Sequence, residues 1–98
     1  MAGGRMVVGI THDREHRRLQ TTVDGSLCVL DYALEGAVMT ITHTEVPPEV
    51  GGRGIAAALV RTALELAREA GWSVSPACSY AAAWMQRHPE YDDLRAPR

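Results

Sequence analysis

Two prolines and three glycines fall within eight residues at the middle of this 98-residue sequence, where residues 47–54 read Pro-Pro-Glu-Val-Gly-Gly-Arg-Gly. Proline cannot donate a hydrogen bond to a strand ladder, and glycine weakens any helix or strand that contains it. We therefore expect no regular element to run through this segment. The chain must fold as two halves that meet here, and the spacing of apolar residues differs between them.

The first half has the pattern of β-strands. Short apolar runs and β-branched residues in alternation predict strands. Four runs qualify: residues 6–10, 18–23, 26–34 and 37–46. The pairs at 24–25 and 35–36, Asp-Gly and Glu-Gly, are typical of tight turns between antiparallel strands. The first half therefore predicts an antiparallel meander.

The second half has the period of a helix. From Ile55 to Ala70, apolar residues recur at intervals of three and four, and Gly71 favours a helix end. Residues 72–75 predict a short strand, and residues 79–87 predict a second helix that His88-Pro89 terminates. The order β-β-β-β-α-β-α predicts an α+β fold. The polar tail from Glu90 is expected to be partly loose.

Length, charge and cysteine usage argue against a multidomain, nucleic-acid-binding, membrane or metal-binding protein. We expect one domain over residues 1–98, because the chain is too short for two cores. The net charge of −2, with interspersed charges, argues against a nucleic-acid partner. No run is apolar enough to cross a membrane and no secretory pattern follows Met1, so we expect a cytoplasmic protein. Cys28 and Cys78 show no metal-ligand spacing, which predicts reduced thiols and no metal. Cys28 is expected in the core, and the histidines at 12, 16 and 88 on the surface.

The segment from Gly51 to Ala56 is the part of the sequence that indicates chemistry. Its glycines let the main chain approach a ligand closely. The predicted helix begins here, so its unpaired amides and positive dipole end face the same place. Together these features predict a site for a phosphate or pyrophosphate. A tight strand-to-helix turn that uses glycine without binding anything would have the same composition.

Two other nucleotide-binding motifs are excluded. A Walker loop requires lysine, and the chain contains none. Residues 52–57 satisfy the loose dinucleotide pattern G-x-G-x-x-[GA]. That fingerprint, however, requires a parallel βαβ unit with an acidic residue about 20 positions further on. The next predicted strand ends at Ser75-Pro76 without a carboxylate, so we interpret the match as accidental.

The segment resembles motif A of the GNAT acetyltransferases, [Q/R]-x-x-G-x-[G/A], in which Gly54 and Ala56 fit while Gly51 replaces Gln or Arg. A short single-domain subgroup adds His-Thr-x-Val-Pro, R-G-x-G and Pro-x-Cys, which are similar to residues 43–47, 52–54 and 76–78. The resemblance spans nearly the whole chain. It implies a minimal GNAT fold, a mixed sheet whose fourth and fifth strands splay apart, and acetyl-coenzyme A as the cosubstrate.

By this resemblance the cofactor lies between the fourth and fifth strands. The backbone of residues 44–46 would contact pantetheine, and the amides of residues 51–56 would bind the pyrophosphate. Arg53 would contact a phosphate or remain a solvated loop side chain. The expected cofactor-binding residues are Thr44, Val46, Gly51, Gly52, Arg53, Gly54, Ile55, Ala56, Ser79 and Tyr80.

The expected catalytic residues are Cys78, His43 and Glu45. Larger GNAT enzymes commonly have Asn after the fifth strand and, seven residues on, a Tyr that serves as general acid; this chain has Cys78 and Met85 there. Cys78 would accept the acetyl group, contact the cofactor or be a packed thiol, and Tyr80 is an alternative acid.

His43 and Glu45 are candidates for the base that the reaction requires. Attack on a thioester needs a neutral amine, and therefore a group to take its proton. The two residues are two apart on one predicted strand and so share a face. The alternatives are a structural histidine and a solvated carboxylate.

The resemblance implies an N-acetyltransferase that acts on a small amine or on a protein lysine or N-terminus. The alternative is a coenzyme A-binding module of little or no turnover that acts through partner contacts, which the methionine at position 85 favours. A small interaction domain without a ligand is a third hypothesis.

Overall fold

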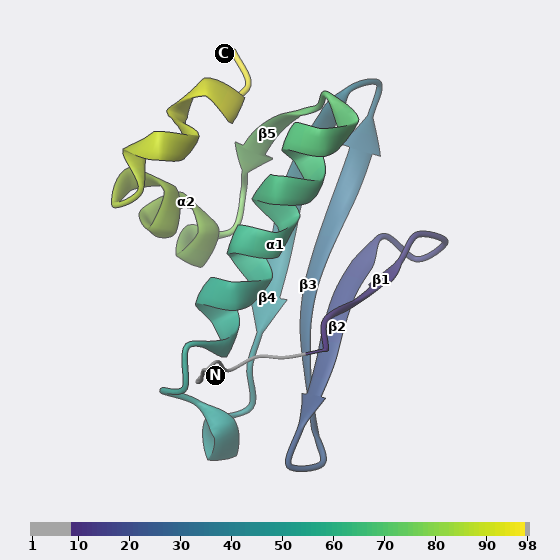
Figure 1. Cartoon of the computed structure of the whole chain (residues 1–98), viewed down its shortest axis with the longest axis vertical. Helices are drawn as coiled ribbons and strands as arrows, with labels where there is room; N and C mark the ends of the chain where they lie inside the picture. The colour runs from purple at the N-terminus through teal and green to yellow at the C-terminus, as the bar shows by residue number, and fades with distance from the viewer. Residues whose placement is uncertain (1–8, 98) are drawn as a thin grey trace.

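The computed structural model describes residues 9–97, in which five strands, two α-helices and two 3₁₀-helices follow one another along the chain (Figure 1). Their bounds are β1 Thr11–Asp13, β2 Arg18–Val23, β3 Ser26–Glu35, β4 Val38–Glu45, η1 Pro48–Val50, α1 Ile55–Ala70, β5 Ser73–Pro76, α2 Ser79–Gln86 and η2 Pro89–Leu94. The predicted α+β class is confirmed.

The five strands form one mixed sheet in the order β1-β2-β3-β4-β5. Each strand pairs with its neighbour antiparallel, except that β4 and β5 run parallel. A parallel pair requires a crossover, which α1 supplies on one side of the sheet. The predicted meander followed by a helix and a fifth strand is therefore confirmed, with the mixed sheet that the resemblance implied.

The first strand does not coincide with the apolar run that predicted it. β1 covers Thr11–Asp13, where Thr11 is opposite Gln20 and Asp13 is opposite Arg18. Residues 6–8 of the predicted strand lie outside the described residues, and Gly9 and Ile10 precede β1. The pairing with β2 determines where this edge strand forms, and apolar periodicity carries no information about that pairing.

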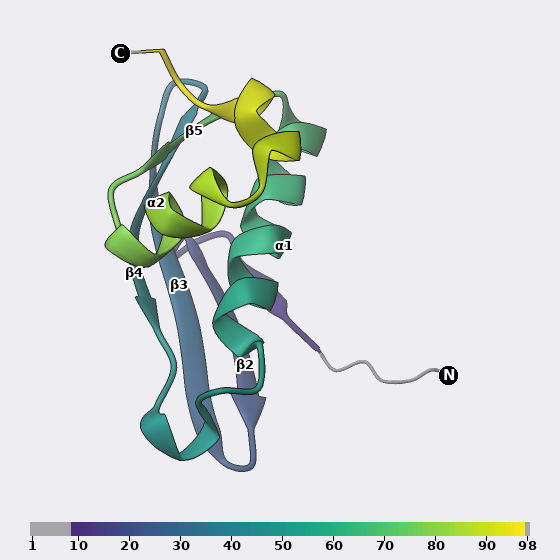
Figure 2. The same ribbon diagram turned by 90° about the vertical axis from the view of Figure 1, so that its left-hand side faces the viewer.

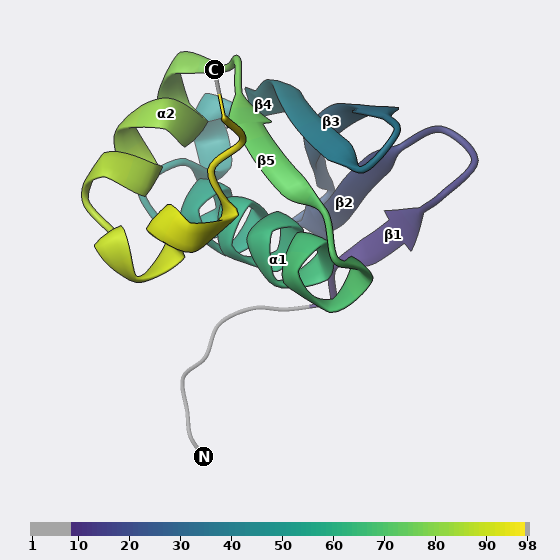
Figure 3. The same cartoon turned by 90° about the horizontal axis from the view of Figure 1, so that it is seen from above.

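The core lies between the sheet and α1, which packs along one face (Figures 2 and 3). Leu59, Ala63 and Leu64 of α1 are completely buried against that face. α2 lies beside the β5 edge of the sheet (Figure 3). Within residues 9–97, no helix combines the length and the apolar character that a membrane span requires.

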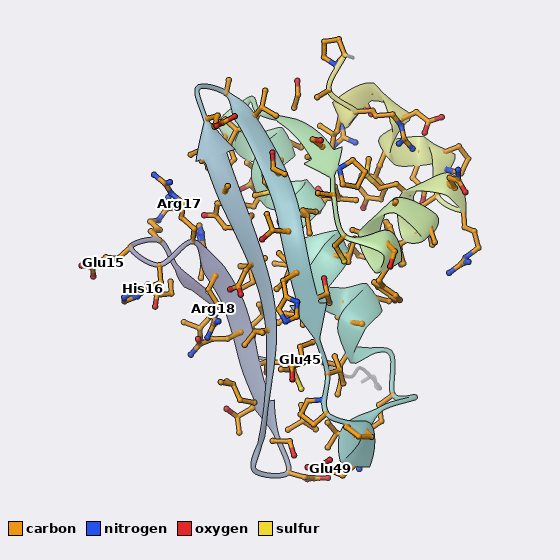
Figure 4. The ribbon with its side chains drawn as sticks, turned by 180° about the vertical axis from the view of Figure 1, so that it is seen from behind. Glu15, His16, Arg17, Arg18, Glu45 and Glu49 are labelled. Atoms are coloured by element: carbon orange, nitrogen blue, oxygen red, sulfur yellow. The ribbon has the colours of Figure 1, made fainter. Side chains whose placement is uncertain are left out.

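No helix within residues 9–97 covers the face of the sheet opposite α1, as the view from behind shows (Figure 4). We call it the open face; it carries the side chains of Arg18, Asp31, His43 and Glu45. Arg18 donates to both carboxylate oxygens of Asp31, at 2.7 and 3.1 Å. The open face therefore carries paired charges, while the face under α1 is the one that holds the core.

The C-terminal tail is ordered, in contrast to the expectation from its polarity. η2 buries Tyr91 and Leu94 to within 4% and 7% of complete burial. The Tyr91 hydroxyl donates to Glu65 of α1 at 2.6 Å, and Arg68 of α1 pairs with Asp93 at 2.8 Å. Two buried apolar residues, a hydrogen bond and an ion pair thus attach this polar segment.

Candidate active site

β4 and β5 separate halfway along β4. Their parallel pairing runs from Val38 opposite Ser73 to Ile41 opposite Pro76 and ends there. The carbonyl of Ile41 accepts the amides of both Ala77 and Cys78 at 3.0 Å. β4 continues to Glu45 beside β3 alone (Figure 1). The splayed strands that the resemblance implied are confirmed, and we call the place where residues 42–45 diverge from residues 77–78 the β4–β5 opening.

A β-bulge lies in β4 at the edge of this opening. On β3, Tyr32 is opposite Ile41 and the preceding Asp31 is opposite His43, so Thr42 is an extra residue. The Thr42 hydroxyl donates to the carbonyl of Asp31 at 3.2 Å. One inserted residue reverses the alternation of side chains along a strand. Ile41 and Thr44 therefore both point to the face of the sheet that α1 covers, which we call the helix side. Without the bulge Thr44 would lie on the open face.

Thr44 and Cys78 meet across the opening. The Cys78 Sγ lies 3.5 Å from the Thr44 Oγ1. Cys78 is half-buried and precedes the first residue of α2, with extended backbone angles. Burial raises the pKa of the Cys78 thiol, but the Ala81 amide, the Thr44 hydroxyl and the Tyr80 amide outweigh it and lower the pKa below its usual range. Such a thiol is more readily ionised than an isolated cysteine.

Tyr80 and Met85 occupy different environments on α2. Met85 is completely buried in the core, and its thioether has no proton to give. Tyr80 is half-buried next to Cys78. Burial raises the pKa of the Tyr80 phenol, Arg87 lowers it, and negative charge on Cys78 raises it further, with a net increase. Tyr80 therefore keeps its proton at neutral pH.

The glycine loop presents unpaired amides at the start of α1. The first amide with a helical partner is that of Ala58, which donates to the Gly54 carbonyl at 3.0 Å. The amides of residues 55–57 are thus left free by the helix. Gly52 and Gly54 have φ of +78° and +77°, and a Cβ on either would meet no atom of residues 9–97 within 4 Å. The Gly51 amide, in contrast, donates to Pro48 within the loop at 3.1 Å.

The turn between β2 and β3 is held against this loop. Arg53 pairs with Asp24 at 2.7 Å, and the Ser26 hydroxyl donates to Glu49 at 3.3 Å. Both side chains of the ion pair are about half or more exposed, so the pair contributes at most about 1 kcal/mol to stability. Such a weak pair leaves Arg53 able to exchange its carboxylate for another anion.

His43 and Glu45 come together on the open face. The His43 Nε2 lies 3.2 Å from the Glu45 Oε1, and both side chains are more than half exposed. Glu45 is seen from behind in Figure 4. The two residues share a face as the sequence predicted. They lie on the side of β4 opposite Thr44, and so opposite the thiol of Cys78.

A cavity of about 770 Å³ lies between β2 and the start of α1. Arg53 and Ile55 line it, but neither Thr44 nor Cys78 does. It is therefore separate from the β4–β5 opening. Within residues 9–97, no three possible metal-ligating side chains gather in one place.

Two features of the site were absent from the sequence analysis. One is the Thr42 bulge, and the other is the side chain of Thr44, whose backbone alone was assigned a role. The positions of Cys78 and Thr44 in two motifs gave each a role, but no local signal indicates that residues 34 apart in sequence touch.

Comparisons with known proteins agree with this architecture. A sequence model of the family described as GCN5-related N-acetyl-transferase matches residues 18–94. Protein NATD1 of Mus musculus is 31% identical over 85 residues, which cover 84% of this chain and 77% of NATD1. Human NATD1 is also 31% identical over 85 residues, covering 84% of this chain and 75% of NATD1.

Solved structures show the same fold. A GCN5-like protein of Staphylococcus aureus, determined by NMR, has a TM-score of 0.74 at 24% identity over 92% of this chain and 89% of its own. Ribosomal-protein-alanine N-acetyltransferase of Brucella melitensis biovar Abortus 2308 has a TM-score of 0.50 at 21% identity, over 83% of this chain and 63% of its own. With the sequence match over most of its length, the chain belongs to the GCN5-related N-acetyltransferase family.

Proposed function

We propose that this protein transfers the acetyl group of acetyl-coenzyme A to an amine, either a small molecule or a protein lysine or N-terminus. The observation that carries the proposal is the β4–β5 opening next to the glycine loop. An extended cofactor arm fits between strands that have separated, and its anionic end fits against free amides at a helix start. Family membership supports the same reaction class.

The cofactor's pyrophosphate is bound by the backbone amides of residues 52–56. Gly51 shapes the turn but gives no hydrogen bond to the phosphate, because its amide already donates to the Pro48 carbonyl. Arg53 leaves Asp24 and adds a charge-assisted contact to a phosphate. The backbone from Thr44 to Val46 holds the pantetheine along the unpaired edge of β4. Ser79 and Tyr80 at the start of α2 line the other side.

The acceptor amine approaches from the open face, where either His43 or Glu45 takes its proton directly or through water. The amine nitrogen then bonds to the acetyl carbon, the bond from that carbon to the coenzyme A sulfur breaks, and coenzyme A leaves as a thiolate. Tyr80 or water returns a proton to that sulfur. Cys78 either contacts the thioester or itself accepts the acetyl group before the amine does.

A coenzyme A-binding module without substantial turnover is the second candidate. It is favoured by Met85, which is completely buried where larger GNAT enzymes commonly have a tyrosine acid. Both functions require cofactor binding. They differ in whether an amine accelerates the release of coenzyme A.

Two measurements on the intact protein separate these functions. Acetyl-coenzyme A should raise the melting temperature, because a ligand at a hundred times its Kd stabilises the folded state by about 2.7 kcal/mol. Release of free thiol is then followed with a panel of amines and basic peptides. Amine-dependent release supports the transferase, and binding without release supports the module. A titration with neither heat nor a melting shift would contradict both.

A further inference from the structure

We propose that the side-chain hydroxyl of Thr44, which meets the Cys78 sulfur across the β4–β5 opening, promotes the reactivity of that thiol, which makes Thr44 a positioning residue of the active site. Its role in acetyl transfer rests on the proposed function. The interaction itself belongs to the protein without cofactor and can be tested there. Thr44 enters the proposed function through its backbone, so its side chain is free for a separate task.

The geometry of the pair comes from two elements that are distant in sequence. Thr44 faces the helix side only because the bulge at Thr42 reverses the alternation of β4. Cys78 is placed opposite by the two amides at 77 and 78 that share the Ile41 carbonyl. The resulting separation of 3.5 Å between Oγ1 and Sγ is within hydrogen-bonding range for sulfur. Both atoms are at the opening proposed for the thioester.

The direction of the hydrogen bond follows the charge on the sulfur. The neutral thiol donates to the threonine oxygen. Once the thiol ionises, the hydroxyl donates to the thiolate, and hydrogen bonds to charged acceptors are the stronger kind. The amides of Tyr80 and Ala81 at the start of α2 also lower the pKa of Cys78. The hydroxyl is the one of these groups that a substitution can remove without changing the backbone.

The charged groups nearby do not replace this contact. Tyr80, next to Cys78, stays protonated because its pKa is raised, chiefly by burial, and the charge of Arg87 acts against that increase. On α1, Arg61 stacks over Trp84 at 5.3 Å and Glu65 accepts from Tyr91. His43 and Glu45 of β4 lie on the open face. Burial has the largest single effect on the pKa of Cys78 and raises it, and the hydrogen-bond donors around the sulfur are the groups that lower it.

The test is the rate at which iodoacetamide alkylates Cys78 in the protein without cofactor, followed by peptide mass across a pH series. Thr44→Val has the shape of threonine but no hydroxyl. It should react about tenfold more slowly at pH 7, the effect expected when a hydrogen bond to a charged group is lost. Its profile should move to higher pH, because a donor that lowers the pKa has been removed. Thr44→Ser should restore the wild-type profile.

Two controls accompany these variants. Thr40→Val makes the same change on the same strand but between the buried Met39 and Ile41, so its side chain is on the open face, and it should react like wild type. Cys28 is completely buried and burial raises its pKa, so its peptide should stay unmodified in every folded sample. If Thr44→Val melts early, Thr44→Ala provides a second variant without the hydroxyl.

A wild-type pH profile in folded Thr44→Val, or failure of Thr44→Ser to restore reactivity, would overturn the proposal. A second arm repeats the reaction with acetyl-coenzyme A present. Protection of Cys78 supports the cofactor site at the opening. Absence of protection, with the Thr44 dependence intact, would overturn that cofactor site while supporting the hydrogen bond, so the two proposals fail separately.

Discussion

Gly54 and Gly71 stand at the two ends of α1 in the same backbone conformation. Their φ angles are +77° and +79°, and in the part of the chain that the structure describes a Cβ at either position would meet no atom within 4 Å. An alanine at either site is therefore strained by about 1–2 kcal/mol without a steric clash. What differs is the surroundings: Gly54 belongs to the loop proposed to bind pyrophosphate, whereas Gly71 leads into β5.

This equivalence gives a prediction about cofactor binding. Gly54→Ala and Gly71→Ala should lose similar free energies of unfolding, measured with urea. Gly54→Ala alone should weaken acetyl-coenzyme A by about tenfold or more in calorimetric titration, because its Cβ occupies space that the phosphate needs. Equal affinities in the two variants would mean that the phosphate does not lie against Gly54.

At the scale of elements, η2 closes the core beyond the C-terminal part of α1. Tyr91 and Leu94 are buried, and Trp84 of α2 packs against Tyr91 with ring centroids 5.6 Å apart. Further along, the Ala96 amide donates to the carbonyl of Val74 in β5 at 2.8 Å. η2 and the residues that follow it thus join α1, α2 and β5.

Leucine replacements test whether this packing stabilises the fold. Leu94→Ala should lower the free energy of unfolding by about 2–4 kcal/mol, the usual cost of truncating a buried leucine. Leu27→Ala is the matched control, since Leu27 is 47% exposed. It should cost less than about 0.5 kcal/mol. Urea unfolding measures both, and a similar cost for the two would show that η2 does not stabilise the core.

At the scale of the whole molecule, the two faces of β4 separate two groups of residues. Thr44 faces the helix side together with Cys78, and His43 and Glu45 lie on the open face. An acetyl group held in the β4–β5 opening would be reachable from both sides. The proposed function then assigns cofactor binding and deprotonation of the acceptor to opposite faces.

This arrangement predicts that the two tasks can be lost independently. Glu45→Gln and His43→Gln should leave the affinity for acetyl-coenzyme A unchanged. The residue that acts as base should show a kcat lower by roughly a hundredfold, the lower end of the range for general-base catalysis. Glu35→Gln, an exposed carboxylate at the far end of β3, is the control and should match wild type. If both variants keep a normal kcat with every amine tested, the base lies elsewhere.

Local chemistry determined much of this structure. Apolar residues alternate in residues 18–46 and follow a helical period in Ile55–Ala70. Each pattern shows which side of an element meets the core, and both can be recognised in the sequence. Gly71 ends α1 as predicted. Cys28 is buried as expected. The glycine loop at the start of α1 was predicted from residue types alone, because an irregular, closely approachable backbone requires glycine.

Tertiary contacts decided the rest. The sequence predicted His12 and His88 to be surface residues. In the structure, the His12 Nε2 lies 2.6 Å from the Tyr32 hydroxyl, and the His88 ring stacks on Trp84 with ring centroids 3.6 Å apart. The position of β1, the Thr42 bulge and the burial of η2 depend in the same way on a partner distant in sequence. Periodicity reports which face of an element is apolar. It does not report which element will cover that face, or that an inserted Thr42 will turn Thr44 toward Cys78.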